Sequence, residues 1–242
     1  MVAKRVYEGG FNTYGRSLGI LMLETTTPRP PGDIGNARTF DYPVKYEVVD
    51  GATPVRVVRE QDSELLEPFR KAAMSLVDQG VVAITTNCGF LLGFQTELSD
   101  CIPEVPVFTS SLLQIPLVKS MIAQEQQIGI LSADEMKLKE LDHPLLVENR
   151  NRLVIEGLAT SEPFQEVLID RSNDKLDLDL VGKEVINATE RLITGNSIGA
   201  IIFECTNLRP YIQDVQEITG LPVFDYLTLA DLAWQASKGT RY

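Results

Sequence analysis

An internal repeat is the feature of this sequence that most restricts its fold. The two copies are GVVAITTNCGFLLGFQTELSDCIPEVPVFTSSLLQIPLV from residue 80 and GAIIFECTNLRPYIQDVQEITGLPVFDYLTLADLA from residue 199. Each contains a strand-like run, a turn with a cysteine, a helical stretch and a Pro-Val-Phe strand. Cys88 precedes Pro106 by 18 residues and Cys205 precedes Pro222 by 17. Since SLGILML at 17–23 and QQIGILS at 126–132 open corresponding halves, the chain is predicted to be a tandem duplication of one small unit.

Each unit is predicted to be α/β. Helical periodicity covers 63–79 and 181–194, and these segments end at Gly80 and Gly195. Strands that alternate with helices favour doubly wound parallel sheets, whose strands are buried on both faces and read as short apolar runs. Such runs occur at 18–23, 46–49, 81–85, 105–108, 127–131, 153–155, 167–169, 199–203 and 222–224.

Cys88 and Cys205 are the candidate catalytic residues. Each follows a predicted strand, and open α/β sheets bind ligands at the carboxyl ends of their strands. If the halves face each other about a pseudo-twofold axis, both thiols reach one cleft. Only 3 of the 242 residues are cysteines, so a cysteine at the matching turn of each half is not expected to arise by chance. The pair therefore favours a shared function over the alternative that both cysteines are simply small buried side chains. Cys101 has no counterpart in the second half, and we expect it to be structural.

Other kinds of active site have little support in the sequence. Zinc needs three or four Cys or His ligands, whereas this chain has no CxxC and a single histidine, His143, which we expect in a surface turn. The GxSxG, GxxxxGK[ST] and GxGxxG motifs are absent, which argues against a serine hydrolase and against a nucleotide cofactor. We therefore expect neither a metal nor a cofactor.

Two opposed thiols can transfer a proton without a cofactor. A helix N-terminus after each cysteine is expected to lower the thiol pKa toward neutrality. One thiolate then removes a proton from one face of a carbon, and the opposite thiol returns a proton to the other face. Backbone N–H groups and the side chains of Asn87, Thr206 and Asn207 are candidates for binding a carboxylate and its enolate-like intermediate.

At TTNCGF and ECTN the sequence resembles the aspartate/glutamate racemase superfamily, which includes hydantoin racemase, maleate isomerase and arylmalonate decarboxylase. The resemblance implies two flavodoxin-like units, a cofactor-independent reaction and an interdomain active site. By position, two cysteines match the catalytic bases and four residues match the anion-binding turns: Cys88 and Cys205, then Asn87, Gly89, Thr206 and Asn207.

The resemblance also implies a domain layout. The final segment returns to complete the first domain in that superfamily, so we expect 17–118 with 215–242 as the first half and 119–214 as the second. Residues 1–16 are expected to be an N-terminal extension. Dimers are common in the superfamily, so a homodimer is a further expectation.

The turns and the first loop depart from glutamate racemases. Those enzymes follow their first cysteine with Asn-Thr and their second with Thr-His, whereas here Gly89 follows Cys88 and Asn207 stands where the histidine would be. The loop ETTTPRPPGDIGNARTF, residues 24–40, resembles a loop over an active site. Its Asp33, Asn36 and Arg29 are candidates for substrate contact, although solvation of the loop explains their polarity equally well.

These observations predict a racemase or epimerase of a small carboxylate, such as aspartate or glutamate, that uses two cysteine bases. A decarboxylase requires one cysteine, so the second cysteine argues against it. The alternatives are a maleate-type cis-trans isomerase or another reaction of the superfamily, and a non-catalytic carboxylate-binding protein.

The net charge restricts the partners. The sequence has 22 Lys and Arg residues and 34 Asp and Glu residues, which gives a net charge of −12. A surface with this negative charge repels nucleic acid and anionic membranes. No window has 18 consecutive apolar residues, and the first residues carry no apolar stretch typical of a secretory signal, so we expect a cytoplasmic location.

Overall fold

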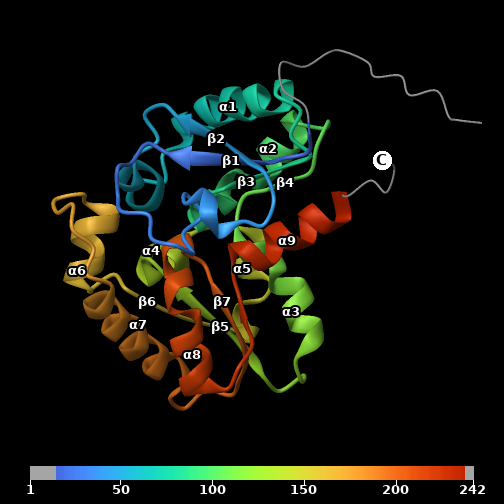
Figure 1. The fold of residues 1–242 in the computed structure, drawn as a ribbon. Coiled ribbons are helices and arrows are strands. Elements are labelled where there is room, and N and C mark those ends of the chain that lie inside the picture. Colours follow the sequence, from blue (N-terminus) through green and yellow to red (C-terminus); the bar gives the residue numbers. More distant parts are fainter. Residues whose placement is uncertain (1–14, 238–242) are drawn as a thin grey trace, which may run out of the picture.

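The computed structural model describes residues 15–237, which contain two four-stranded parallel sheets (Figure 1). The first sheet has the order β2-β1-β3-β4, and its strands are β1 (Leu18–Leu23), β2 (Val44–Val49), β3 (Ala83–Thr86) and β4 (Val107–Phe108). The second has the order β6-β5-β7-β8, with β5 (Gln127–Ser132), β6 (Leu153–Gly157), β7 (Ile198–Phe203) and β8 (Val223–Phe224). Because the two orders are equivalent, the sequence repeat corresponds to a repeated topology, and the predicted α/β fold of two doubly wound units is confirmed.

Helices flank both sheets. Their bounds are α1 (Leu66–Asp78), α2 (Gln95–Cys101), α3 (Ile115–Met121), α4 (Glu135–Glu140), α5 (Pro144–Val147), α6 (Glu162–Phe164), α7 (Leu178–Ile193), α8 (Ile212–Thr219) and α9 (Tyr226–Ser237). The two predicted helices correspond to α1 and α7, each of which buries one apolar face. Gly80 and Gly195 follow them with φ of +77° and +74°, a left-handed conformation that glycine adopts without steric cost.

The strand predicted at 167–169 is wrong. These residues lie in a π-helical turn, Gln165–Ile169, which corresponds to a similar turn at Val55–Arg59 in the first half. Val167, Leu168 and Ile169 are all buried. A short apolar run signals burial without distinguishing strand from helix, and here the run is three residues long.

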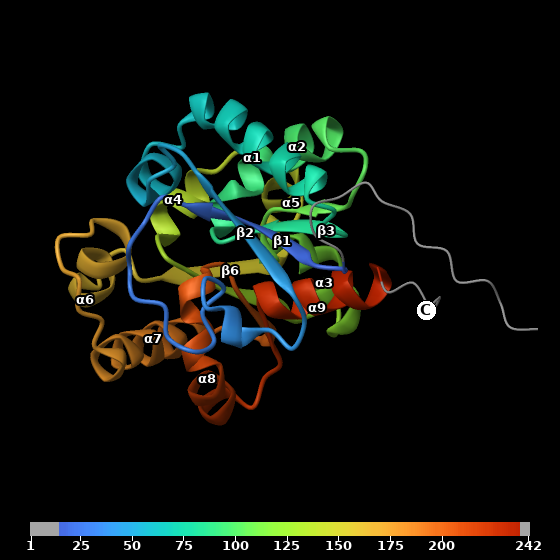
Figure 2. The ribbon, with the colours of Figure 1, turned by 45° about the horizontal axis from the view of Figure 1, so that its top comes forward.

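Each half sends its last helix onto the other half. After β4, α3 lies beside the second sheet, and after β8, α9 lies beside the first (Figures 1 and 2). From α9, Tyr226 and Ala230 are buried in a cluster with Leu18, Ile20 and Phe108 of the first sheet. β8 lies inside the segment 215–242 but pairs with β7 in the second sheet, so within that segment α9 is the helix that packs on the first half.

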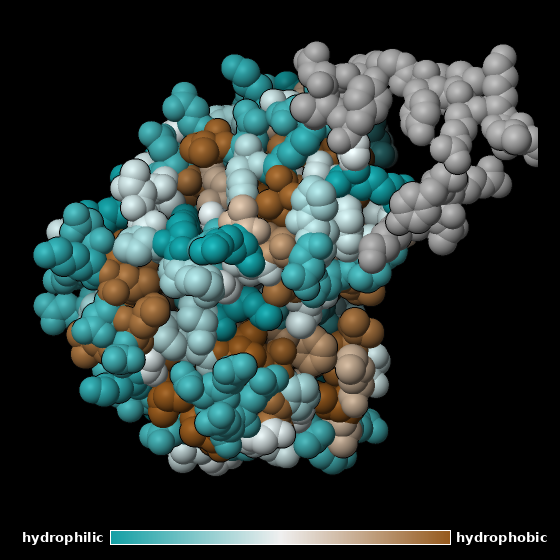
Figure 3. Space-filling model, viewed as in Figure 1, coloured by the Kyte–Doolittle hydropathy of each residue, from teal (hydrophilic) through white to brown (hydrophobic). Residues whose placement is uncertain are grey.

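Most of the predicted N-terminal extension is outside the described part of the chain, and the face of that part shown in Figure 3 has mixed polarity. Residues 1–14 of the predicted N-terminal extension lie outside the described residues. Among residues 15–237, no helix is long and apolar enough to cross a membrane. On the face shown in Figure 3, hydrophobic side chains are scattered among hydrophilic ones.

Candidate active site

Cys88 and Cys205 line one cavity between the two halves. Cys88 follows β3 and caps the 3₁₀ turn Gly89–Phe94, which leads into α2. Cys205 follows β7 and caps the turn Thr206–Tyr211, which leads into α8. The full lining is Leu23, Thr25, Thr27, Arg29, Pro54, Val58, Asn87, Cys88, Phe90, Ala133, Leu168, Ile169, Glu204, Cys205 and Asn207.

The residue before each cysteine bonds to the end of the neighbouring strand. In the first half, the N–H of Leu23 donates to Asn87 Oδ1 over 2.8 Å. In the second half, the N–H of Ala133 donates to Glu204 Oε2 over 3.2 Å, and the Ser132 hydroxyl donates to the same oxygen over 2.9 Å. The repeat therefore keeps this hydrogen bond but places an amide in one half and a carboxyl group in the other.

The carboxyl group of Glu204 is buried at the junction of the halves. Glu204 is 1% exposed, and its Oε1 has no hydrogen-bond partner among the described residues. A Cβ atom at position 89 would overlap both Oε1 and the backbone oxygen of Glu204, so the residue after Cys88 has to be glycine. Burial raises the pKa of Glu204 to about 7, although the hydrogen bonds from Ala133 and Ser132 act against that shift.

The expected lowering of the thiol pKa values is wrong. Desolvation raises the pKa of Cys88 and of Cys205, and the negative charge of Glu204 raises both further. Backbone N–H groups do favour the thiolates: those of Phe90 and Leu91 act on Cys88, and that of Asn207 acts on Cys205. Burial beside an acidic side chain outweighs the helix N-termini, so both thiols are held protonated.

Two hydroxyl groups join the halves beside the cysteines. Thr206 Oγ1 donates to the backbone oxygen of Asn87 over 2.8 Å, and Ser111 Oγ donates to that of Phe203 over 2.6 Å. The predicted anion-binding hydroxyl of Thr206 therefore has a partner in the opposite half. These bonds fix the spacing of the two cysteine turns.

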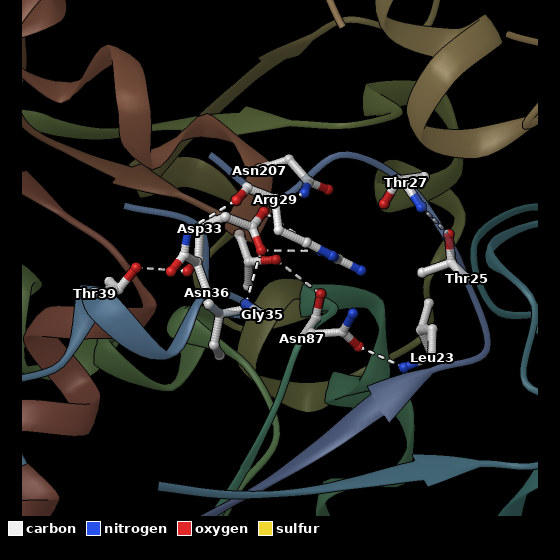
Figure 4. A network of polar contacts seen from close by, with 12 residues as sticks. Leu23, Thr25, Thr27, Arg29, Asp33, Gly35, Asn36, Thr39, Asn87 and Asn207 are labelled. Atoms are coloured by element: carbon white, nitrogen blue, oxygen red, sulfur yellow. Dashed lines mark hydrogen bonds and ion pairs between the residues drawn. The ribbon is translucent and has the colours of Figure 1, made fainter. Parts of the chain in front are cut away.

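The 24–40 loop reaches the second half through Asp33. The Asp33 carboxylate is 1% exposed, forms an ion pair with Arg29 Nη1 at 3.1 Å, and accepts a 2.7 Å hydrogen bond from Asn207 Nδ2. Asn207 in turn accepts a 3.6 Å hydrogen bond from the Cys205 thiol at Oδ1. Figure 4 shows the Arg29 side chain extending between Asp33 and the side of the site where Asn87, Thr25 and Thr27 lie. A chain of polar contacts thus connects the loop with one of the two thiols.

Other hydrogen bonds of the 24–40 loop hold its backbone in place. Asn36 donates from Nδ2 to the Arg29 backbone oxygen and caps the short turn Ala37–Thr39, and it does not line the cavity. The hydroxyl groups of Tyr226 and Tyr46 donate to the backbone oxygens of Gly32 and Ile34. The loop is therefore held by the first half, by α9 and by Asn207.

Apolar side chains form another part of the lining, which we call the apolar wall. Val58 comes from the π-helical turn Val55–Arg59, and Leu168 and Ile169 come from its counterpart Gln165–Ile169. Pro54 and Phe90 extend the same lining. Since π-helical turns occur frequently at functional sites, their paired presence here fits a site shared by the two halves.

The remaining residues considered in the sequence lie elsewhere. His143 caps α5 by accepting the N–H of Leu145 at Nδ1, and Cys101 is exposed at the end of α2. Within the described part of the chain, no group of three or more His, Cys, Asp or Glu residues is placed to hold a metal ion.

Sequence reasoning missed Glu204 and the apolar wall. The repeat contained a signal for Glu204, because it takes the position of Asn87 immediately before a cysteine and directly follows the apolar run GAIIF. The apolar wall gave no such signal, because 167–169 predicts a strand and the segment with Pro54 and Val58 belongs to no predicted element.

Comparison with curated proteins assigns the family. The chain is 32% identical over 223 residues to a dimethylsulfoniopropionate lyase of Durusdinium sp. clade D, and the match covers 89% of this chain and 73% of that protein. The chain belongs to the dimethylsulfoniopropionate lyase family. It is also 34% identical over 223 residues to dimethylsulfoniopropionate lyase 7 of Emiliania huxleyi, where 88% of this chain matches 64% of the relative. The chain spans 57 to 64% of the length of three Emiliania huxleyi relatives, and no protein-family model matches it.

Solved structures share the fold at low sequence identity. A sulfate-associated mutant of arylmalonate decarboxylase has a TM-score of 0.62 at 15% identity and covers 93% of this lyase-family chain and 94% of its own. Aspartate racemase of Picrophilus torridus has a TM-score of 0.56 at 14% identity, covering 92% and 94%. Allantoin racemase of Klebsiella pneumoniae has a TM-score of 0.59 at 13% identity, covering 94% and 91%. The fold is that of the aspartate/glutamate racemase superfamily, as the sequence predicted.

Proposed function

We propose that this protein is a lyase that cleaves dimethylsulfoniopropionate by β-elimination. The compound named in its relatives is a propionate that carries a dimethylsulfonium group on the carbon β to the carboxylate. Removal of an α-proton by a thiolate would give an enediolate, which expels dimethyl sulfide and leaves acrylate. Racemisation begins with the same α-proton transfer, so a racemase fold suits this reaction.

The composition of the cavity lining is the observation that carries this proposal. Among the described residues of the lining, Arg29 is the single cation. An acidic amino acid has two carboxylates and an ammonium group, whereas dimethylsulfoniopropionate has one carboxylate and one sulfonium cation whose sulfur carries two methyl groups. The apolar wall of Val58, Leu168 and Ile169 matches those methyl groups. The lining therefore favours a monocarboxylate with an apolar leaving group over aspartate or glutamate.

Arg29 is the proposed carboxylate anchor. Asp33 contacts its Nη1, and a guanidinium group has further N–H donors on Nε and Nη2 in a planar arrangement that matches a carboxylate. Asp33 would then orient Arg29, and Asn207 would hold Asp33. Of the predicted substrate-binding residues, Asn87 and Asn207 line the cavity, while Asp33 acts through Arg29.

The two thiols are proposed to have different roles. The Cys205 thiol donates to Asn207 Oδ1, which holds it in the protonated form. Two backbone N–H groups act on the Cys88 sulfur and stabilise a thiolate there. Cys88 is therefore the proposed base that removes the α-proton. Cys205 is proposed to lie on the opposite side of the substrate as a protonated thiol.

The proposal is tested by incubating the protein with dimethylsulfoniopropionate and measuring dimethyl sulfide and acrylate. We expect equimolar products from the wild type, a loss of at least about 1,000-fold in Cys88→Ser, and unchanged turnover in Cys101→Ser, whose thiol is exposed outside the cavity. Absence of both products at saturating substrate, or full turnover in Cys88→Ser, would overturn the assignment.

Racemisation or epimerisation of a small carboxylate is the second candidate, favoured by the presence of both thiols in one cavity. In D₂O, a two-base racemase incorporates deuterium at the α-carbon of an enantiopure acid as it inverts. This activity would require Cys205 as well as Cys88, so comparison of Cys205→Ser in the two assays separates the candidates. Deuterium incorporation into aspartate or glutamate without any elimination would favour the racemase.

A further inference from the structure

The proposed reaction needs a second base, which takes the thiol proton of Cys88 before Cys88 can act on the substrate. A thiol is a poor proton acceptor, so Cys88 has to lose its proton before it can attack an α-hydrogen. Burial and the charge of Glu204 raise the pKa of this thiol, which leaves little thiolate at neutral pH unless another group takes the proton. His143, the one histidine in the sequence, caps α5 away from the cavity.

Glu204 is the group whose geometry fits that need. It lines the same cavity as both thiols, and its Oε1 is buried with no hydrogen-bond partner among residues 15–237. Its other oxygen, Oε2, is held by Ser132 and Ala133, so the carboxyl group is fixed with one oxygen uncommitted. That oxygen lies against Gly89, the residue that follows Cys88. An unpaired buried oxygen is costly, and a proton-transfer role gives a reason to keep it.

We propose that the Glu204 carboxylate takes the thiol proton of Cys88, directly or through one water molecule, and so generates the thiolate that removes the α-proton. This inference rests on the proposed function, because it supplies the base for that reaction. Glu204 would act through Cys88 and not on the substrate.

The charged and titratable groups around Glu204 come from several elements. Cys88 faces it from the end of β3, Cys205 follows it in the chain, and Asp134 lies beyond the end of β5. Arg29 and Asp33 belong to the loop, where they neutralise each other. The nearby acidic groups and burial favour the protonated carboxyl, which is the form that results from accepting the Cys88 proton.

The proton balance closes over one turnover. The S–H bond of Cys88 breaks, its electron pair stays on sulfur, and the proton forms an O–H bond on Glu204. The thiolate then takes the α-proton, the β-carbon–sulfur bond breaks, and dimethyl sulfide leaves with that electron pair. Cys88 is again a thiol, and Glu204 releases one proton to solvent, which matches the net reaction of a zwitterion to acrylate, dimethyl sulfide and one proton.

Alkylation of Cys88 by iodoacetamide tests the inference without any substrate. The rate is followed by peptide mass spectrometry between pH 5.5 and 9 in the wild type, Glu204→Gln and Ser132→Ala. In the wild type we expect the rate to rise through an inflection near pH 7, where Glu204 ionises, and then to level off. In Glu204→Gln that inflection should disappear, and the rate should keep rising about tenfold per pH unit. In Ser132→Ala, loss of a hydrogen bond to the carboxylate should move the inflection upward by about one pH unit.

The exposed thiol of Cys101 is the control within the same molecule, and its profile should be identical in all three proteins. A Cys88 profile in Glu204→Gln with the wild-type inflection, or a wild-type profile without one, overturns the inference. Should Glu204→Gln not fold, the Ser132→Ala shift decides the question. The measurement is independent of the proposed lyase activity, so a protein that fails to cleave dimethylsulfoniopropionate can still show the alkylation inflection.

Discussion

At the scale of single residues, Glu204 makes the stability of the protein depend on pH. Its pKa is about 7 in the folded protein against an ordinary value of 4.5, so the folded chain holds this proton more tightly than the unfolded chain does. The stabilising contribution is therefore complete below about pH 4.5 and is lost as the pH rises through about 7.

The shift corresponds to about 3 kcal/mol between the two ends of that range. We expect the free energy of unfolding in urea to fall between pH 5 and pH 8 in the wild type, and to fall by about 2.5 kcal/mol less in Glu204→Gln. The exposed Glu67, whose ion pair with Arg70 lowers its pKa, provides the comparison, because Glu67→Gln should keep the wild-type loss. Equal slopes in the wild type and Glu204→Gln would contradict the raised pKa.

At the scale of the element, the 24–40 loop depends on the Asp33 carboxylate. Asp33 bonds to Arg29, to the N–H of Gly35 and to Asn207, and all of these contacts lie in or beside the loop. Because the carboxylate is buried, removal of its charge leaves the Arg29 guanidinium without its counter-ion.

We expect Asp33→Asn to lower the free energy of unfolding by about 3 kcal/mol. It should also speed hydrogen exchange in residues 29–39 and raise KM for the carboxylate substrate about tenfold, with a smaller change in kcat. Asp62→Asn breaks a more exposed pair, with Arg56 at 2.6 Å outside the cavity, and should change stability by less than about 1 kcal/mol. Unchanged exchange and KM in Asp33→Asn would show that the loop does not depend on this pair.

The conformations of the loop and of the π-helical turns could not be predicted from the sequence. The run at 167–169 predicts a strand because burial makes any short run apolar, and only the backbone distinguishes the π-helical turn that these residues form. Asn36 and Asp33 looked alike in the sequence as loop polar residues, yet one caps a turn and the other is buried in an ion pair. The Asn36 contacts are local, whereas Asp33 also accepts a hydrogen bond from Asn207, which is distant in the chain.

At the scale of the whole molecule, the exchange of terminal helices predicts that the halves unfold together. α9 buries Ala230 completely against the first sheet, although the strand before it pairs in the second. A larger side chain at this position should disturb both halves, because the helix connects them.

We expect calorimetry to show one transition for the wild type and for Ala230→Leu, with the variant shifted downward by about 6 °C, which corresponds to an overpacking cost of about 2 kcal/mol. Leu232 lies on the same helix and is 55% exposed, so Leu232→Ala should leave the transition within about 1 °C. Two separate transitions, of which Ala230→Leu moves only one, would show that the halves unfold independently.

Much of the fold and part of the site followed from the sequence alone. Short-range periodicity predicts the helices and strands, because it depends on residues close together in the chain. The internal repeat predicts two similar units and places a cysteine at a strand end in each. The α/β fold of two doubly wound units was predicted on that basis, and the resemblance at TTNCGF and ECTN added the superfamily.

The chemistry of the site was decided by the tertiary structure. The sequence predicted lowered thiol pKa values from the helix N-termini, but the second half places a buried carboxyl group beside Cys88, and desolvation reverses the shift. Arg29, Val58 and Leu168 line the site from segments far apart in the chain. Desolvation and charge interactions depend on which atoms lie within a few ångströms, and only folding brings those atoms together.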